Sequence, residues 1–292
     1  MGATTAPTDS WDACVCTIEK ANSLLNRAAD EGALESIGFY KRLPLNRFSQ
    51  HIQLIAMSAT ISNLFELAHW FNAISYETQF RPIELREGIL VNGSVLDVQT
   101  FSPLRAIKPH SEVQTEADWI IALCVESLSN DGSVLVFCSS KSETEKIASL
   151  LCDYFNESTS AGDHHLKSNV LDIIKTNSLK SFEEYFRSET QSNDEILLRT
   201  IPNGIAFHHA GLTMEEREAI EDGFRGGQLR VLTATSTLSS GVNLPAQTVI
   251  IKAQMSGPSA LTNTTYRQMV GRAGRLGQSS KGLSNHFIRL TN

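Results

Sequence analysis

Blocks of apolar residues alternate with amphipathic stretches through the second half of the chain. Val134–Cys138 is an unbroken apolar run, which is typical of a strand buried on both faces of a sheet. Shorter runs predict three further strands, at residues 204–207, 230–235 and 248–252. Strands that alternate with helices predict an α/β domain, in which a parallel sheet is covered by helices on both faces and binds ligands at the carboxyl ends of its strands.

Capping signals place the helices between these strands. Thr213 and Glu216 predict a capping box for a helix from about Met214 to Phe224, and Gly226-Gly227 ends it. Ser142 and Glu145 predict the same box for the helix after Val134–Cys138. A last helix is expected near residues 266–272, and the polar residues 156–203 are interpreted as a helical insertion.

The first third of the chain is harder to interpret. Residues 17–36 have helical periodicity, and Ile52–Met57 is a short apolar strand that precedes a helix opened by Asn63 and Glu66. Residues 79–101 contain an Asn92-Gly93 turn between β-rich runs and are interpreted as a connection between domains. We therefore expect a first-domain remnant at 1–75, a connection at 76–112 and a second domain at 113–292.

Composition narrows the class of protein. Hydrophobic residues make up 41% and charged residues 20% of the chain, as in an ordinary soluble protein, and no apolar run reaches the roughly 20 residues of a membrane span. The five cysteines are scattered, which predicts reduced thiols in an intracellular protein and no zinc site.

The charge of the chain is unevenly distributed. The net charge is −7, which by itself argues against a nucleic-acid ligand. Residues 223–292, however, contain no Asp or Glu and carry eight Lys or Arg residues. A basic final quarter on an acidic protein predicts a surface that faces phosphates, although the acids could be missing there by chance.

Small polar clusters follow the predicted strands. Ser139-Ser140-Lys141 follows the first strand, His208-His209 follows the second, and residues 236–245 follow the third. Because parallel strands end at one edge of a sheet, these clusters are expected side by side. Hydroxyl and backbone N–H groups at helix starts bind phosphates well, whereas a single cluster would be no more than a helix cap.

Gln268–Arg275 is the densest candidate site. Arg272 and Arg275 are three residues apart, so on a helix they would share a face, and Gly271 and Gly274 would leave room for a bulky anion. Two guanidinium groups directed at one place suit a polyphosphate. The alternative is a solvated basic helix end.

Other chemistries fit the sequence less well. His208-His209 lacks further metal ligands at suitable spacing, which favours a structural pair and no metal site. Ser58 has no G-x-S-x-G elbow around it and is not predicted to be a nucleophile. The glycines at 271, 274 and 277 have the wrong spacing for a dinucleotide fingerprint.

Together these segments resemble the motifs of Ski2-like superfamily 2 helicases, above all those related to the helicase domain of DNA polymerase theta. The resemblance rests on segments in the family's order: Thr17–Asn22, Ser58–Thr60, Val134–Lys141, Phe207–Leu212, Thr233–Ala246 and Gln268–Arg275. It implies that the second half is the second RecA-like domain of an ATP-dependent 3′-to-5′ DNA translocase, which uses ATP and Mg²⁺.

The resemblance also implies roles for single residues. Arg275 would be the finger on the γ-phosphate, with Arg272 and Gln268 beside it, and Gly241, Asn243 and Gly271 would line the nucleotide cleft. DNA phosphates would be bound by Thr17, Ser139, Thr235 and Ser236. Ser58 and Thr60 would couple hydrolysis to domain movement.

The sequence departs from the family at two motifs. It contains no G-x-x-x-x-G-K-[ST] phosphate loop, and Ile37-Gly38 runs directly into Phe39, where the family has a strand bearing Asp-Glu-x-His. We therefore expect a truncated or alternatively spliced product of a nuclear DNA-repair helicase that cannot hydrolyse ATP by itself. Expected partners are single-stranded or forked DNA, and full-length helicase or repair proteins.

Three alternatives remain open. The chain could be a non-enzymatic module that binds nucleic acid or regulates a helicase. It could be a relative that acts on RNA, because these motifs do not separate DNA from RNA. It could also be a gene-model artefact that does not fold stably.

Overall fold

The computed structural model describes residues 64–78, 85–108, 115–157, 169–239, 244–252 and 261–273, and the backbone of 285–290. All of them belong to one of the two units into which the chain divides, Thr60–Asn292. The predicted helix at 17–36, the strand at 52–57, and residues Thr17, Ser58 and Thr60 lie outside the described residues. The helix expected after Asn63 is present as α2 (Leu64–Phe71).

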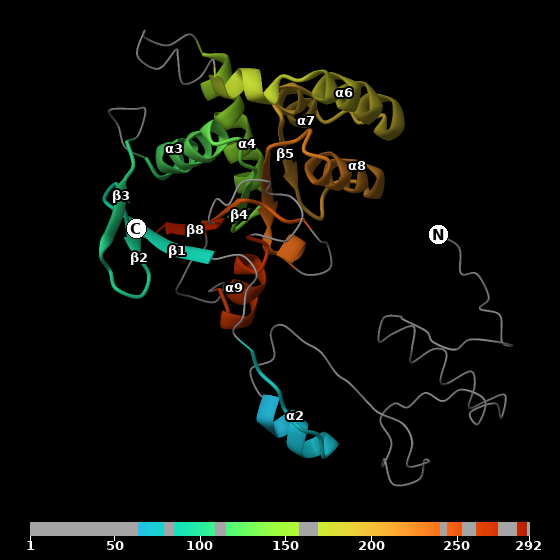
Figure 1. Ribbon diagram of the computed structural model, residues 1–292. Coiled ribbons are helices and arrows are strands. Elements are labelled where there is room, and N and C mark those ends of the chain that lie inside the picture. The colour runs from blue at the N-terminus through green and yellow to red at the C-terminus, as the bar shows by residue number, and fades with distance from the viewer. Residues whose placement is uncertain are drawn as a thin grey trace, which may run out of the picture. The chain divides into compact units, whose positions relative to one another are not determined.

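A single sheet of eight strands organises the described residues, in the order β3-β2-β1-β8-β7-β4-β6-β5 (Figure 1). Six adjacent strands, from β1 to β5 in this order, run parallel. The strands are β1 (Leu85–Val91), β2 (Ser94–Asp97), β3 (Pro103–Ala106), β4 (Val134–Cys138), β5 (Ile205–His208), β6 (Val231–Thr235), β7 (Thr248–Ile251) and β8 (Asn285–Leu290). The predicted parallel sheet is confirmed, and the predicted strands lie within one residue of β4 to β7.

Residues 85–106 form part of this sheet, although the sequence suggested a connection between domains. The Asn92-Gly93 turn joins β1 to β2 as an antiparallel hairpin, with φ of +46° and +78° at the two turn residues. Strand β3 pairs with β2, and Arg105 on β3 forms an ion pair with Glu126 (Nε–Oε1 2.8 Å) on α3 (Glu116–Ser129). The long-range pairing of β1 with β8 places this hairpin in the sheet, and no local pattern could reveal it.

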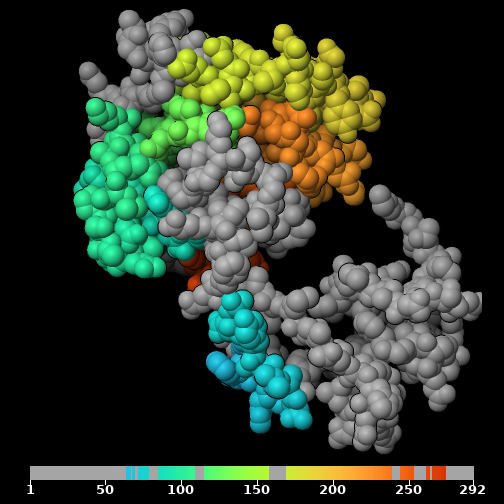
Figure 2. Space-filling model, in the orientation of Figure 1, coloured from blue at the N-terminus to red at the C-terminus, as the bar shows by residue number. Residues whose placement is uncertain are grey.

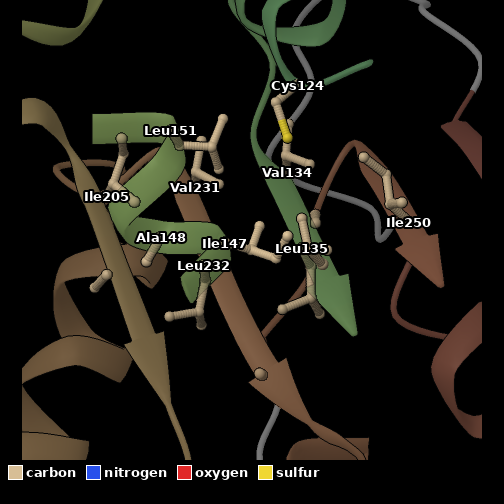
Figure 3. Packing of buried hydrophobic residues seen from close by; sticks show 14 of the residues in the cluster. Cys124, Val134, Leu135, Ile147, Ala148, Leu151, Ile205, Val231, Leu232 and Ile250 are labelled. Atoms are coloured by element: carbon tan, nitrogen blue, oxygen red, sulfur yellow. The ribbon is translucent and has the colours of Figure 1, made fainter. Parts of the chain in front are cut away.

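Helix α4 (Lys141–Asn156) packs across the centre of the sheet. Its residues Ile147, Ala148 and Leu151 are buried and lie against Ile205 on β5 and the β6 residues Val231 and Leu232 (Figure 3). Every residue of β4 is buried, in agreement with the apolar run from which it was predicted. This core fixes the carboxyl ends of the three strands relative to one another.

The first turn of α4 differs from the prediction. The N-cap is Ser140, whose Oγ accepts a hydrogen bond from the Glu143 backbone N–H, and the predicted pair Ser142 and Glu145 both lie inside the helix. The prediction was wrong by two residues, because several hydroxyl and Glu residues stand in succession there and the end of β4 decides which of them becomes the cap.

The segment at 156–203, predicted as an insertion, is part of the domain core where it is described. Residues 169–174 are helical and are followed by α6 (Asn177–Thr190) and α7 (Glu195–Thr200). Helix α6 lies against α8 (Met214–Arg225) (Figures 1 and 2), and a Cβ at Gly223 of α8 would meet the Phe182 ring at 2.4 Å. The helical character predicted for the segment is confirmed at these residues, and its buried side chains add to the core of the domain.

Helix α3 was not predicted from the sequence. Its residues from Ile120 to Val125 are all buried, so it shows little of the amphipathic periodicity that identifies a surface helix. Among the described residues, no helix has the length and apolar character to cross a membrane.

Candidate nucleic-acid interface

The carboxyl ends of β7, β4, β6 and β5 lie next to one another in the sheet. Cys138 is in register with Thr235, and Ala234 is in register with His208, so the residues that follow the three strands are neighbours. Ser139 and Ser236 are exposed at this edge. The polar clusters after β4, β5 and β6 therefore meet at one sheet edge, as the sequence predicted.

Ser139 is engaged by a carboxylate. Its backbone N–H and its Oγ both donate to Glu143 Oε2, at 2.8 and 2.6 Å. The other oxygen, Glu143 Oε1, lies 2.5 Å from the Nζ of Lys252, the residue after β7. Lys252 also contacts Glu116 at the start of α3 (Nζ–Oε2 3.1 Å). The residue predicted to bind a phosphate is thus held by an internal anion.

The pKa values of this cluster follow from its contacts. Burial would raise the pKa of Glu143, but the hydrogen bonds from Lys252 and Ser139 outweigh burial and lower it. Burial would lower the pKa of Lys252, and its two carboxylate partners raise it. Both groups are therefore charged at neutral pH.

Each of the two histidines at the end of β5 contacts a glutamate. His208 Nε2 lies 2.9 Å from Glu221 Oε1 on α8, and His209 Nε2 lies 2.9 Å from Glu145 Oε1 on α4. Both side chains are buried, and burial lowers the pKa of His208. Within the described ranges, no group of three or more His, Cys, Asp or Glu residues is arranged to hold a metal ion.

His209 also shapes the turn beside α4. Its Nδ1 accepts a hydrogen bond from the Gly211 backbone N–H (3.1 Å), and its ring stacks on Phe207. A Cβ at Gly211 would meet the His209 ring at 3.0 Å and the Lys141 Nζ at 3.6 Å. The turn after β5 and the exposed ammonium group of Lys141 are therefore brought together, which sequence spacing alone did not reveal.

The hydroxyl residues Thr235, Ser236 and Thr237, at the end of β6 and just after it, are exposed or half-buried. Thr235 Oγ1 and Thr237 Oγ1 lie 2.9 Å apart, and Ser236 opens the 3₁₀ turn η3 (Ser236–Ser239). Two residues predicted for the nucleotide cleft, Gly241 and Asn243, lie outside the described residues.

The Gln268–Arg275 segment differs from the predicted arrangement. Helix α9 (Asn263–Val270) carries Gln268 and ends before Gly271, whose N–H closes the helix on Arg267 O. Arg272 is buried in the following turn, and its carbonyl accepts a hydrogen bond from the Ala246 N–H (3.1 Å). The helix expected near residues 266–272 therefore ends at Val270, and Arg272 lies beyond it. The shared face of Arg272 and Arg275 stays a prediction. Arg275 lies outside the described residues.

The basic final quarter is partly neutralised in the folded chain. Arg230 pairs with Asp131 (3.0 Å), Arg225 pairs with Asp222, and Lys252 pairs with Glu116 and Glu143. These acids precede residue 223, so the count by sequence segment overstated the positive surface. Arg267 is exposed on α9.

Comparison with known proteins shows which family has this sheet and these motifs. Residues 170–277 match the model of the helicase conserved C-terminal domain. The chain is 37% identical to DNA polymerase theta of Mus musculus, over 97% of the chain and 13% of the relative. It is 33% identical to Helicase POLQ-like of Homo sapiens, over 92% of the chain and 26% of the relative. The chain belongs to the Ski2-like DNA helicases.

An archaeal relative extends the match. The chain is 34% identical to the ATP-dependent DNA helicase Hel308 of Caldivirga maquilingensis, over 94% of the chain and 37% of the relative. The chain therefore spans a minority of the length of each of these relatives. The alignment with the mouse protein runs over 322 positions, more than the 292 residues of the chain, so the relative has residues within the aligned region that this chain lacks.

Proposed function

We propose that the described sheet is the second RecA-like domain of a Ski2-like DNA-repair helicase, and that it binds single-stranded or forked DNA along its carboxyl edge. The supporting observation is the register of β4, β6 and β5, which brings three polar clusters to one edge. Ser139, Thr235 and Ser236 would contact phosphates there, and Lys141 adds a cation beside them.

The proposed nucleotide contacts come from the segments before and after β7. Gln268, Gly271 and Arg272, with Arg275, Gly241 and Asn243, would face the phosphates of a nucleotide. Thr17 would add a phosphate contact, and Ser58 and Thr60 would couple the two halves. These roles come from the resemblance of the motifs, and all but the first three residues lie outside the described part of the chain.

The residues present do not make a complete site for ATP and Mg²⁺. The sequence has no phosphate loop and no Asp-Glu-x-His, and the described ranges bring no cluster of metal-ligating side chains together. We therefore propose that this chain by itself binds nucleic acid without hydrolysing ATP. A nuclear location and action beside a full-length helicase or repair proteins belong to the same proposal.

Binding of a labelled oligothymidylate, measured by fluorescence anisotropy at several salt concentrations, tests the interface. We expect affinity to fall steeply with salt, and the double variant Thr235→Ala/Ser236→Ala to bind about tenfold more weakly, the share of two phosphate contacts. Ser188→Ala on α6 is the matched control, because this exposed hydroxyl lies on a helix away from the edge. Equal losses in both variants would refute the assignment of the edge.

ATPase activity in the presence of DNA, with Arg275→Ala beside the wild type, tests the second half of the proposal. We expect no turnover by either protein. Turnover by the wild type that is lost in the variant would mean that a phosphate loop is supplied by other residues or by a second copy, and the proposed inactivity would be wrong.

The competing proposal is a helicase relative directed to RNA. The edge described above offers hydroxyl, amide and ammonium donors to phosphates, which do not by themselves separate the two nucleic acids. Anisotropy with DNA and RNA oligonucleotides of one sequence decides between them, and at least tenfold tighter binding of RNA would favour the alternative.

A further inference from the structure

The Ser139–Glu143–Lys252 cluster lies between β4 and β7, two adjacent strands from which the chain continues toward opposite edges of the sheet. From β4 the chain passes through α4 to β5 on one side of β4 in the sheet order, whereas β7 borders β4 on the other side. Helix α9, which follows β7, lies in Figure 1 on the other side of the strands from α4. In open α/β sheets, ligands bind at the carboxyl ends of strands at such a switch point.

An internal carboxylate occupies this position. Glu143 Oε2 accepts both the N–H and the Oγ–H of Ser139, and Glu143 Oε1 pairs with Lys252 Nζ. The Glu143 side chain is only 18% exposed, whereas Ser139 is exposed to solvent. A nucleic acid can therefore approach Ser139 from outside, but it finds both donors already engaged.

The need to cap α4 does not explain this arrangement. Ser140 caps the helix by accepting from the Glu143 N–H, and this bond does not involve the Glu143 side chain. At the start of α8, Glu216 holds the same position relative to its cap and bonds the backbone N–H of the cap residue itself, Thr213 (2.8 Å). Glu143 instead reaches one residue further back, to the residue predicted to contact a phosphate.

A carboxylate and a phosphodiester use the same donors. Each accepts hydrogen bonds from a backbone N–H and a hydroxyl group, so the two donors of Ser139 can hold one or the other. We propose that Glu143 is an internal competitor of the nucleic-acid phosphate at Ser139, and that binding there requires the Glu143 carboxylate to leave. This inference rests on the proposed function, because it concerns the same interface.

When the Glu143 carboxylate leaves Ser139, it still has Lys252 as a partner. Lys252 bridges Glu143 and Glu116, so the carboxylate can leave Ser139 and keep its ion pair. While Glu143 occupies the donors of Ser139, the free chain binds nucleic acid more weakly. Because Lys252 at the end of β7 contacts Glu143, a movement of this strand end alters the affinity of Ser139 for a phosphate. The device is thus an autoinhibitory contact between two strand ends.

Binding of a fluorescein-labelled oligothymidylate by five proteins tests this inference: wild type, Glu143→Gln, Glu116→Gln, Ser139→Ala and Ser139→Ala/Glu143→Gln. Glu116→Gln is the matched control, since it removes the same charge from Lys252 without touching Ser139. We expect Glu143→Gln to bind about threefold more tightly than Glu116→Gln, the share of one phosphate contact. The gain in affinity from Glu143→Gln should be smaller when Ser139 is also replaced by Ala.

Equal affinities of Glu143→Gln and Glu116→Gln would overturn the inference and leave the proposed function standing. A gain that is the same with and without the Ser139 hydroxyl would also overturn it. Absence of binding by every protein would refute the proposed function together with the inference. In the wild type, the Ser139 amide resonance in ¹⁵N NMR should move when oligothymidylate is added, and an unchanged resonance under saturation would contradict displacement without the use of any variant.

Discussion

The helices that follow β4 and β5 begin with the same residue pattern and use it differently. Each has a hydroxyl cap and a Glu three residues later: Ser140 and Glu143 in α4, Thr213 and Glu216 in α8. In α8 the two residues form a reciprocal capping box, and Glu216 is buried and accepts from Ser192 Oγ (2.5 Å). In α4 the carboxylate instead bonds Ser139 and the ammonium group of Lys252.

The difference separates a structural carboxylate from a displaceable one. Glu216 is itself buried and joins the start of α8 to Ser192, so its loss leaves the Thr213 N–H and the Ser192 hydroxyl without this acceptor. Glu143 satisfies donors that face solvent at the proposed interface, so another anion can replace it. The same local pattern thus predicts stability at one strand end and ligand exchange at the other.

Replacement of Glu216 should have the largest effect on folding. We expect Glu216→Ala to lower the free energy of unfolding by about 2 kcal/mol, because the Thr213 N–H and Ser192 hydroxyl lose their acceptor. Guanidinium denaturation measures it. Glu215→Ala in the same turn is the control, since Glu215 is exposed, and should change stability by less than about 0.5 kcal/mol. Similar losses of stability in both variants would show that Glu216 does not have the structural role proposed for it.

Acid should destabilise the protein through His208, which joins β5 to α8. Burial lowers its pKa in the folded state below the ordinary value of 6.5, so the unfolded chain takes up the proton first as pH falls. This contribution to stability is therefore complete above pH 6.5 and declines below it, with a slope of at most about 1.4 kcal/mol per pH unit.

Urea denaturation between pH 5 and pH 7.5 measures this dependence, with His208→Gln as the comparison. The variant should lose the His208 part of the slope, even though it is less stable at every pH. An identical slope in both proteins would show that His208 is not the titrating group.

Replacement of Glu143 should have the smallest effect on stability. We expect Glu143→Gln to cost less than about 1 kcal/mol, since the carboxylate is partly exposed and the neutral amide still accepts from Ser139, although more weakly than a carboxylate does. The sign with pH is opposite for the two partners. The lowered pKa of Glu143 gives a contribution that is lost as pH falls below 4.5, and the raised pKa of Lys252 gives one that is lost as pH rises above 10.5.

Thermal unfolding at pH 7 compares this variant with Glu116→Gln, which removes the other ion pair of Lys252. Similar small shifts are expected. If Glu143→Gln lowered the stability as much as Glu216→Ala, Glu143 would be structural. The two glutamates would then not differ in role.

Much of the central sheet could be predicted from local patterns. Strand β4 was found from its apolar run, and the α8 capping box was found from Thr213 and Glu216, because burial and capping act over a few neighbouring residues. The edge that carries Ser139, Thr235 and Ser236 followed from the rule that parallel strands end together. Helix α3 gave no such signal, because it is buried on nearly every side.

The sequence by itself determined the class of fold, the order of the motifs and the edge of the sheet at which their side chains meet. Tertiary structure decided which of these side chains are available. Glu116, the Ser139–Glu143 pair and Lys252 come from three separate parts of the chain, and Lys252 reaches Glu143 because β7 and β4 are adjacent. Such contacts depend on strand order, which is set by the packing of the whole domain, so no local pattern of residues encodes them.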